Sequence, residues 1–135
     1  MEVLVSSFLL NFFWEVLQTR YYMHSVLSFN QHFPMLIVAS ILDIFWMLIL
    51  FYIGVSWFSK KEWIVNKGVS KYFFAFICGI FLGAIVEFFS VNVLRLWSYG
   101  LSMPIIPFFN IGIFPVMQFG VISLVIIFVM NIFFE

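Results

Sequence analysis

The stretch NFFWEVLQTRYY, residues 11–22, places a glutamate inside an otherwise apolar run near the start of the sequence. Asn11, Glu15, Gln18 and Tyr22 recur at spacings of four, three and four residues, so a helix would carry them on one stripe. Aromatic and aliphatic residues occupy most of the positions between them. The pattern predicts an apolar helix whose polar stripe faces protein rather than lipid.

The composition of the chain extends this prediction to the whole sequence. Of the 135 residues, 65% are hydrophobic and only 9% are charged, too few polar groups to cover a water-soluble surface. We therefore expect an integral protein of the cell membrane, with membrane lipid as its first partner. The zero net charge argues against nucleic acid as a partner.

Four apolar windows are long enough to cross a bilayer, which takes roughly 20 residues in a helix. They give an all-α fold, an integral membrane four-helix bundle in one transmembrane domain, residues 1–135, with helices at about 3–22, 34–58, 72–94 and 105–133. Short loops predict an antiparallel up-down topology. No basic segment or cleavage site marks the first helix as a signal peptide, so we expect it to be retained.

The basic residues predict the orientation of the bundle. Lys60, Lys61, Lys67 and Lys71 lie between the second and third helices, whereas the opposite end has only Arg20 and Arg95. Lysine excess marks the cytoplasmic side. Both termini are then expected in the cytoplasm.

One polar residue from each predicted helix falls at a similar depth from the outer surface. Glu15 is seven residues from Tyr22, Asp43 nine from Pro34 and Glu87 seven from Leu94. At about 1.5 Å per residue these three acids lie ~10 to 14 Å deep, and Gln118 lies at ~15 Å. The sequence thus predicts a polar layer in the outer half of the membrane. We expect it to be a functional site, because ionisable groups at such depth are costly.

The outer ends of the third and fourth helices carry further signals. Gly79, Gly83 and Glu87 share a four-residue spacing, which predicts close helix approach beside the acid. Trp97 and Tyr99, with the prolines that follow them, predict a stiff aromatic outer loop. A kink at Pro115 would line a cavity, although prolines are also common in ordinary transmembrane helices.

Arg95, eight residues after Glu87, is expected to lean toward one of the acids. Burial and like-charged neighbours disfavour ionisation of the others, so the layer should hold protons, hold a cation or open to water. With a lone cysteine, Cys78, and two histidines eight residues apart, His24 and His32, we expect no metal and no cofactor.

Several motifs resemble those of a group of small, uncharacterised four-span membrane proteins of bacteria and archaea. They are N-x2-WE-x2-Q (residues 11–18), W-x-Y (97–99), MP-x2-P (103–107) and P-x2-Q (115–118). The resemblance covers most of the chain and implies no activity. A weaker likeness is to the lycopene cyclase domain and to membrane terpene cyclases, which carry paired acids after a helix proline. Here FPVMQF has Gln118 and no acid, so this likeness implies only a type of chemistry.

Three functions fit the predicted layer. The first is acid–base chemistry on a lipid or isoprenoid-like substrate. The second is a proton- or cation-coupled small transporter or channel. The third is an accessory subunit of a membrane complex, in a homo- or hetero-oligomer. The candidate catalytic residues are Glu15, Asp43 and Glu87. The candidate binding residues, for a hydrophobic small molecule or a cation, are Asn11, Trp14, Gln18, Arg95, Trp97, Tyr99 and Gln118.

Overall fold

The computed structural model describes residues 2–22, 29–61, 63–65 and 68–134 of the chain. Its four long helices are α1 (Glu2–Gln18), α2 (Phe29–Phe58), α3 (Ser70–Phe88) and α4 (Ile113–Phe134). A 3-10 turn, η1 (Thr19–Tyr21), continues α1, and a π-helical turn, η3 (Phe89–Val93), continues α3. Two short strands, β1 (Ile105–Ile106) and β2 (Ile111–Gly112), precede α4. The prediction of an all-α fold is confirmed to this extent: the described chain is mostly helical.

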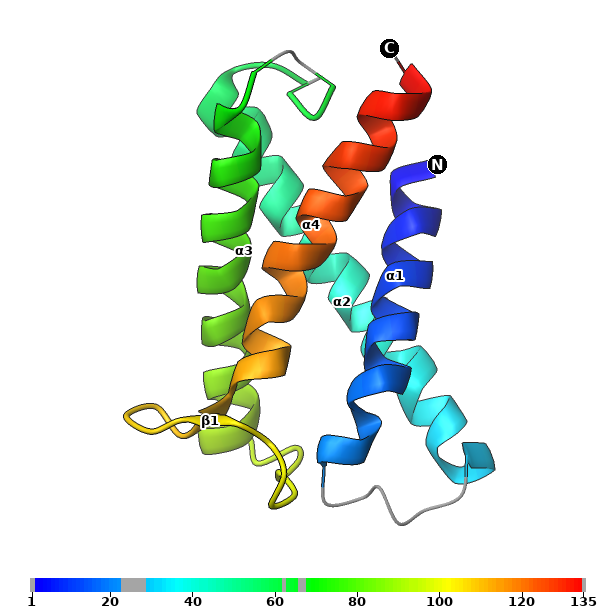
Figure 1. Cartoon of the computed structure of the whole chain (residues 1–135), viewed down its shortest axis with the longest axis vertical. Coiled ribbons are helices and arrows are strands. Elements are labelled where there is room, and N and C mark those ends of the chain that lie inside the picture. The colour runs from blue at the N-terminus through cyan, green and yellow to red at the C-terminus, as the bar shows by residue number, and fades with distance from the viewer. Residues whose placement is uncertain (1, 23–28, 62, 66–67, 135) are drawn as a thin grey trace.

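The helices are arranged as two pairs, as Figure 1 shows. α3 packs along α4 and α1 packs along α2, while α1 also contacts α4 and so joins the pairs. The start of α1, the end of α4 and the segment between α2 and α3 lie at one end of the molecule. The strands and the segment that follows α3 lie at the other end.

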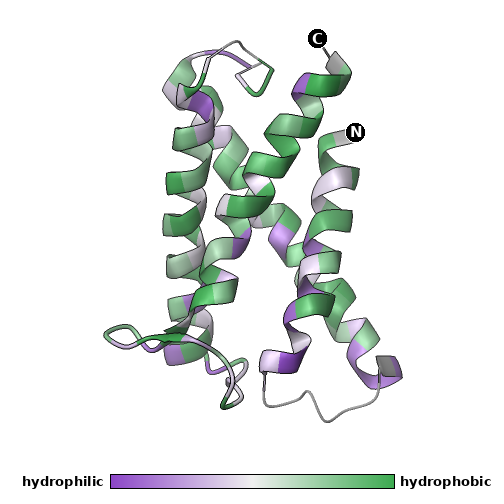
Figure 2. Cartoon of the chain, viewed as in Figure 1, coloured by the Kyte–Doolittle hydropathy of each residue, from purple (hydrophilic) through white to green (hydrophobic). Residues whose placement is uncertain are grey.

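Three of the helices have the length and composition to cross a membrane: Asn30–Phe58, Ser70–Val93 and Ile113–Phe133. Figure 2 shows hydrophobic residues over most of their length, with polar residues gathered in a few places. Large apolar side chains cover the outside, among them Phe73 and Phe81 on α3, which are 72% and 70% exposed. Such a surface is compatible with a membrane protein and would be unusual on a protein that faces water.

Glycines allow α3 and α4 to approach closely, as their spacing predicts. A Cβ atom on Gly83 would lie 2.5 Å from the backbone oxygen of Val116. A Cβ atom on Gly79 would lie 2.6 Å from the backbone nitrogen of Gly120. The two backbones are therefore in direct contact, and this contact brings Glu87 on α3 to the same end as Gln118 on α4.

The hydrophobic core lies toward the other end of the bundle. Trp63 folds back from the segment after α2 and is 1% exposed, with its indole nitrogen donating to the Phe51 oxygen at 3.1 Å. It packs with side chains of α2, α3 and α4, chiefly Met47, Leu50, Phe51, Ala75, Phe119, Ile122, Ile126 and Ile127. Trp63 follows the predicted end of the second span, where an indole ring would favour the membrane interface. The ring is buried instead, because Gly54 has no side chain to occupy the space that the ring fills.

The predicted helix bounds are wrong at several ends, and most of all in the fourth helix. α4 begins at Ile113, not at Ile105, because residues 105–112 form an antiparallel hairpin that pairs Ile105 with Gly112. Asn110 turns the hairpin with a positive φ of 53°. α4 runs through Pro115 as one helix, without the predicted kink. Pro115 lies in the first turn, where a backbone N–H would have no acceptor within the helix, so the proline removes no helical hydrogen bond.

We expect Gly83→Ala to destabilise the protein. Overpacking costs about 1 to 3 kcal/mol, while the gain in helix propensity is at most about 1 kcal/mol. The cost of overpacking should exceed the gain in helix propensity, because the new methyl group would meet the backbone oxygen of Val116, which cannot rotate aside. Thermal unfolding in detergent measures the change. Ile77→Val, on the exposed face of the same helix, is the control, and an equal melting temperature for Gly83→Ala and the wild type would contradict the prediction.

Candidate functional site

The last two turns of α1 supply one side of a polar cluster. The indole nitrogen of Trp14 donates to Gln18 Oε1 at 3.1 Å, and Gln18 Nε2 donates to Glu15 Oε1 at 2.8 Å. Asn11, which is fully buried, donates to the Ser7 backbone oxygen at 2.8 Å. These predicted site residues do share one face of α1, and their hydrogen bonds orient the Glu15 carboxyl group.

The carboxamide of Gln118 joins three helices. Its nitrogen donates to Asn11 Oδ1 on α1 at 3.0 Å and to Asp43 Oδ2 on α2 at 2.8 Å. Its oxygen accepts a hydrogen bond from Gln18 Nε2 at 3.3 Å. Only 3% of Gln118 is exposed, so these contacts replace water. The predicted convergence of α1, α2 and α4 in one polar layer therefore occurs around this side chain.

Glu15 and Asp43 form a carboxyl pair. Gln18 donates to Glu15 and to the Gln118 oxygen, and Gln118 donates to Asp43, so two amides join the two acids. A protonated carboxyl group can donate a proton, and an ionised one can accept it. The pair can therefore act as one group that carries a proton and one site that accepts a proton.

Glu87 lies in a separate part of the cluster. It is 4% exposed and accepts hydrogen bonds from the Trp97 indole nitrogen, at 3.1 Å, and from the Tyr99 hydroxyl. The same hydroxyl accepts from the backbone nitrogen of Gly112 at 2.8 Å. Burial, and then the Glu87 carboxylate, raise the pKa of Tyr99, so the phenol stays neutral and can donate. Glu87 thus fastens residues 94–104 to the end of α3.

Tyr22 packs against the segment that Glu87 holds. It is 6% exposed, its ring centre is 5.7 Å from that of Tyr99 and 6.4 Å from that of Trp97, and its backbone pairs with Tyr99. A tyrosine near a predicted span end favours the membrane interface. Tyr22 instead continues the polar stripe of α1, since it follows Gln18 by four residues.

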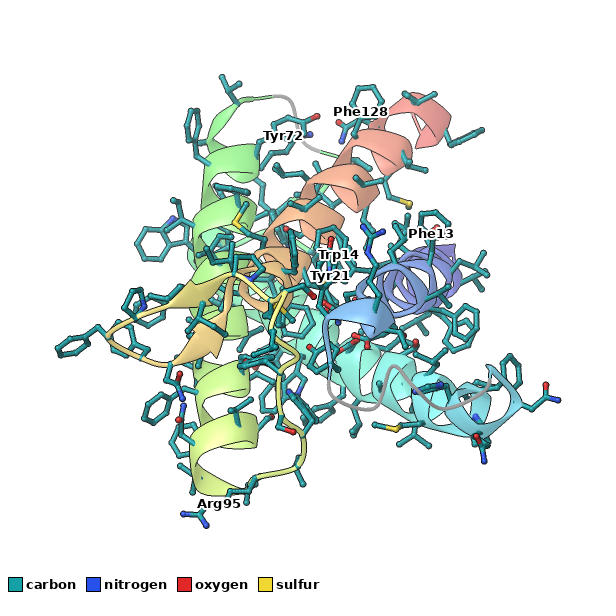
Figure 3. The ribbon with its side chains drawn as sticks, turned by 60° about the horizontal axis from the view of Figure 1, so that its bottom comes forward. Phe13, Trp14, Tyr21, Tyr72, Arg95 and Phe128 are labelled. Carbon is teal, nitrogen blue, oxygen red and sulfur yellow. The ribbon has the colours of Figure 1, made fainter. Side chains whose placement is uncertain are left out.

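The structure does not bring Arg95 into the cluster. The helical turns end at Val93, and Arg95 has a positive φ of 52°, so the face expected from eight further residues of helix is lost. Figure 3 shows Arg95 at the periphery, whereas Trp14 and Tyr21 point toward the middle of the bundle. Arg20 stacks on the Tyr21 ring at 4.8 Å. The prediction that Arg95 leans toward an acid is wrong.

The carboxyl groups of the cluster accept hydrogen bonds from neutral side chains. Within the described part of the chain, no lysine, arginine or histidine contacts the carboxyl groups of Glu15, Asp43 or Glu87. Over the same residues, no three His, Cys, Asp or Glu side chains gather as metal ligands would. His24 and Lys67 lie outside the described residues. The cluster therefore presents protonatable groups set among amides, phenols and indoles.

Comparison of the chain with family models, with curated proteins and with solved structures finds no match. The geometry of the cluster is therefore the basis for assigning a function.

Removing the Tyr99 hydroxyl should loosen residues 94–104. Tyr99→Phe keeps the ring against Tyr22 but leaves Glu87 without one donor and Gly112 N–H without its acceptor. We expect faster amide hydrogen exchange at Gly112, measured by mass spectrometry of peptides in detergent. Tyr52→Phe, on a ring that is 74% exposed, is the matched control. Unchanged exchange at Gly112 would show that Tyr99 does not hold this segment.

Proposed function

We propose that this chain is a membrane-spanning four-helix protein whose Glu15–Asp43 pair performs acid–base chemistry on a lipid or isoprenoid-like substrate. Three helices with the length and composition of membrane spans support the placement. α1 is the proposed fourth span. Its 17 residues and the three of η1 reach about 31 Å together, close to the thickness of the hydrocarbon layer.

The proposed topology is an antiparallel up-down bundle with the lysine segment and both termini in the cytoplasm. The chain directions in Figure 1 support it, because the start of α1 and the end of α4 lie at the end that carries Lys60 and Lys61. In this orientation the carboxyl cluster lies in the outer half of the bilayer. Residues 94–112 then cover its outer side.

The observation that carries the proposed chemistry is that the Gln18 and Gln118 amides join two carboxyl groups that have no basic partner among the described residues. An acid held by arginine stays ionised and cannot donate. Here the protonated member would give its proton to a substrate double bond or carbonyl. The ionised member would take a proton from a neighbouring carbon, which restores one proton to the pair. The net reaction is an isomerisation or a cyclisation.

The surrounding side chains have distinct roles in this proposal. Gln18 and Gln118 orient the carboxyl pair and would stabilise whichever member is ionised. Glu87 positions the outer segment through Trp97 and Tyr99 and is not required to exchange a proton. The rings of Tyr22, Trp97 and Tyr99 pack together and would stabilise a developing carbocation by cation–π contact.

A second candidate is proton- or cation-coupled transport. It is favoured by the same absence of a basic partner around three acids in the described chain, since such groups are free to exchange a proton for a cation. A role as an accessory subunit is favoured by the Gln118 contacts, which would bind the helices together in any complex. Deuterium incorporation and proton flux separate these functions.

The topology can be tested by labelling single cysteines. In a Cys78→Ala background, an impermeant thiol reagent added outside intact cells should modify Ser98→Cys and leave Lys60→Cys unmodified. Both positions are exposed on the protein surface, so a difference in labelling reports the side of the membrane on which each one lies. Opening the membrane should make Lys60→Cys reactive. Labelling of Lys60→Cys in intact cells would reverse the proposed orientation.

The acid–base proposal predicts that solvent deuterium enters a lipid. Proteoliposomes of the wild-type protein, supplied with a total lipid and isoprenoid extract in D2O, should yield a species with added deuterium that mass spectrometry detects. Glu15→Gln and Asp43→Asn keep size and hydrogen bonding but remove the proton equilibrium. We expect each to lower the rate by roughly 100-fold or more, the usual contribution of a general acid or base.

Glu2→Gln, the same change at the first residue of α1, should keep the wild-type rate. Deuteration that survives in well-folded Glu15→Gln and Asp43→Asn would overturn the assignment of the pair. Proton flux that depends on Glu15, measured with an entrapped pH dye and without deuterated product, would favour transport. Neither signal in folded wild-type protein would favour the accessory role.

A further inference from the structure

The hairpin of β1 and β2 carries a pair of exposed phenylalanines at its tip, residues 107–110. Phe108 is 89% exposed and Phe109 is 50% exposed, and their ring centres lie 5.0 Å apart with the ring planes at 80° to each other. Figure 1 shows the hairpin reaching sideways past α3, at the end of the bundle where α3 meets the start of α4. The hairpin tip therefore lies beside the bundle and not over its centre.

The segment around the hairpin tip carries no charge. Residues 96–112 contain no lysine, arginine, aspartate or glutamate. Leu96 and Leu101 in this segment are 58% and 109% exposed. Exposed leucine and phenylalanine side chains gain free energy when they leave water, and no charged neighbour in the segment opposes the transfer. The surface of this segment is therefore complementary to lipid.

A hydrogen bond joins the hairpin tip to the end of the third helix. The side-chain nitrogen of Asn92 in η3 donates to the Phe109 backbone oxygen at 3.1 Å. Phe89 and Val93, on either side of Asn92 in the chain, are 53% and 55% exposed. The apolar surface of the candidate span Ser70–Val93 therefore continues onto the hairpin tip.

The backbone of the hairpin has hydrogen-bond partners of its own. The Asn110 N–H donates to the Ile106 oxygen at 2.9 Å across the turn, and the Ile113 N–H donates to the Pro104 oxygen at 2.9 Å at the base. Pro104 and Pro107 have no N–H that could be left unpaired. Because an unpaired backbone group is costly in lipid, these bonds remove an obstacle to insertion of the hairpin.

We propose that the hairpin tip inserts into the outer leaflet of the membrane and anchors residues 94–112 there. The partner is the boundary between the lipid headgroups and the acyl chains, with the Phe108 and Phe109 rings among the first carbons of the chains. Segments that lie in this boundary use aromatic and aliphatic side chains in the same way. The inference rests on the proposed membrane placement and not on the acid–base chemistry.

A nitroxide at Pro107→Cys reports the surroundings of the hairpin tip while both phenylalanines stay in place. In a Cys78→Ala background, power saturation in lipid nanodiscs measures collisions of the nitroxide with oxygen, which concentrates in lipid, and with a nickel chelate, which stays in water. Phe81→Cys, at a position 70% exposed on α3, is the lipid control, and Lys60→Cys, also exposed, is the water control. We expect the oxygen-to-nickel ratio at Pro107→Cys to lie well above that at Lys60→Cys.

Removing one ring tests whether the phenylalanines hold the tip in the leaflet. Phe108→Ser, added to Pro107→Cys, should lower the equilibrium constant for insertion by roughly tenfold or more and shift the ratio toward the Lys60→Cys value. Phe128→Ser, the same change at a position 59% exposed on α4, should leave the ratio unchanged. Equal ratios with and without Phe108→Ser, in variants with the wild-type melting temperature, would overturn the role of the ring.

The remaining outcomes separate the anchor from the membrane placement. A ratio at Pro107→Cys equal to that at Lys60→Cys, while Phe81→Cys reports lipid, would overturn the anchor alone. A ratio typical of water at Phe81→Cys as well would overturn the membrane placement. Few collisions with either reagent at Pro107→Cys, together with dipolar broadening that disappears on dilution with unlabelled protein, would replace lipid by a second copy of the chain.

Discussion

The polar layer depends on the carboxamide of Gln118, which hydrogen-bonds α1 and α2 from α4. An amide both donates and accepts, so its nitrogen can donate to Asp43 and Asn11 while its oxygen accepts a hydrogen bond from Gln18. A carboxylate at position 118 would place a third acceptor beside Asp43 and Glu15. Glutamine at this position instead supplies a donor to Asp43 and an acceptor to Gln18.

The close contact of α3 and α4 sets the second part of the cluster. Because Gly79 and Gly83 meet the α4 backbone directly, α3 ends beside the start of α4, where the hairpin of β1 and β2 returns the chain. Glu87 then finds its donors in residues that follow α3, and Gly112 just before α4 donates to the same phenol. The three acids belong to one polar cluster but have different environments. Glu87 accepts hydrogen bonds from Trp97 and Tyr99, whereas Glu15 and Asp43 are joined through the Gln18 and Gln118 amides.

The parts of the site that follow helical periodicity were predictable from sequence. The stripe of Asn11, Glu15 and Gln18 is real because α1 is a regular helix through Gln18. The glycine spacing of α3 predicted its close packing for the same reason. Gln118 meets the stripe of α1, although the expected depth of Gln118 counted residues 107–112 as helix, where the chain forms a hairpin. A local repeat is enough to place residues on a shared face, provided that the helix does not end between them.

The failures occur where the chain leaves the helix. Arg95 is eight residues from Glu87, but a π-helical turn and a left-handed residue intervene, so counting by helical turns gives the wrong direction. Ile105 and Ile106 are apolar enough for a span, yet the turn at Asn110 pairs them with residues just before α4. In the hairpin, pairing across the turn decides the backbone, and hydropathy carries no information about such bonds. Arg95 lies outside the cluster for its own reason, the left-handed turn after η3, and the side chains that donate to Glu15 and Asp43 within the described structure are the neutral amides of Gln18 and Gln118.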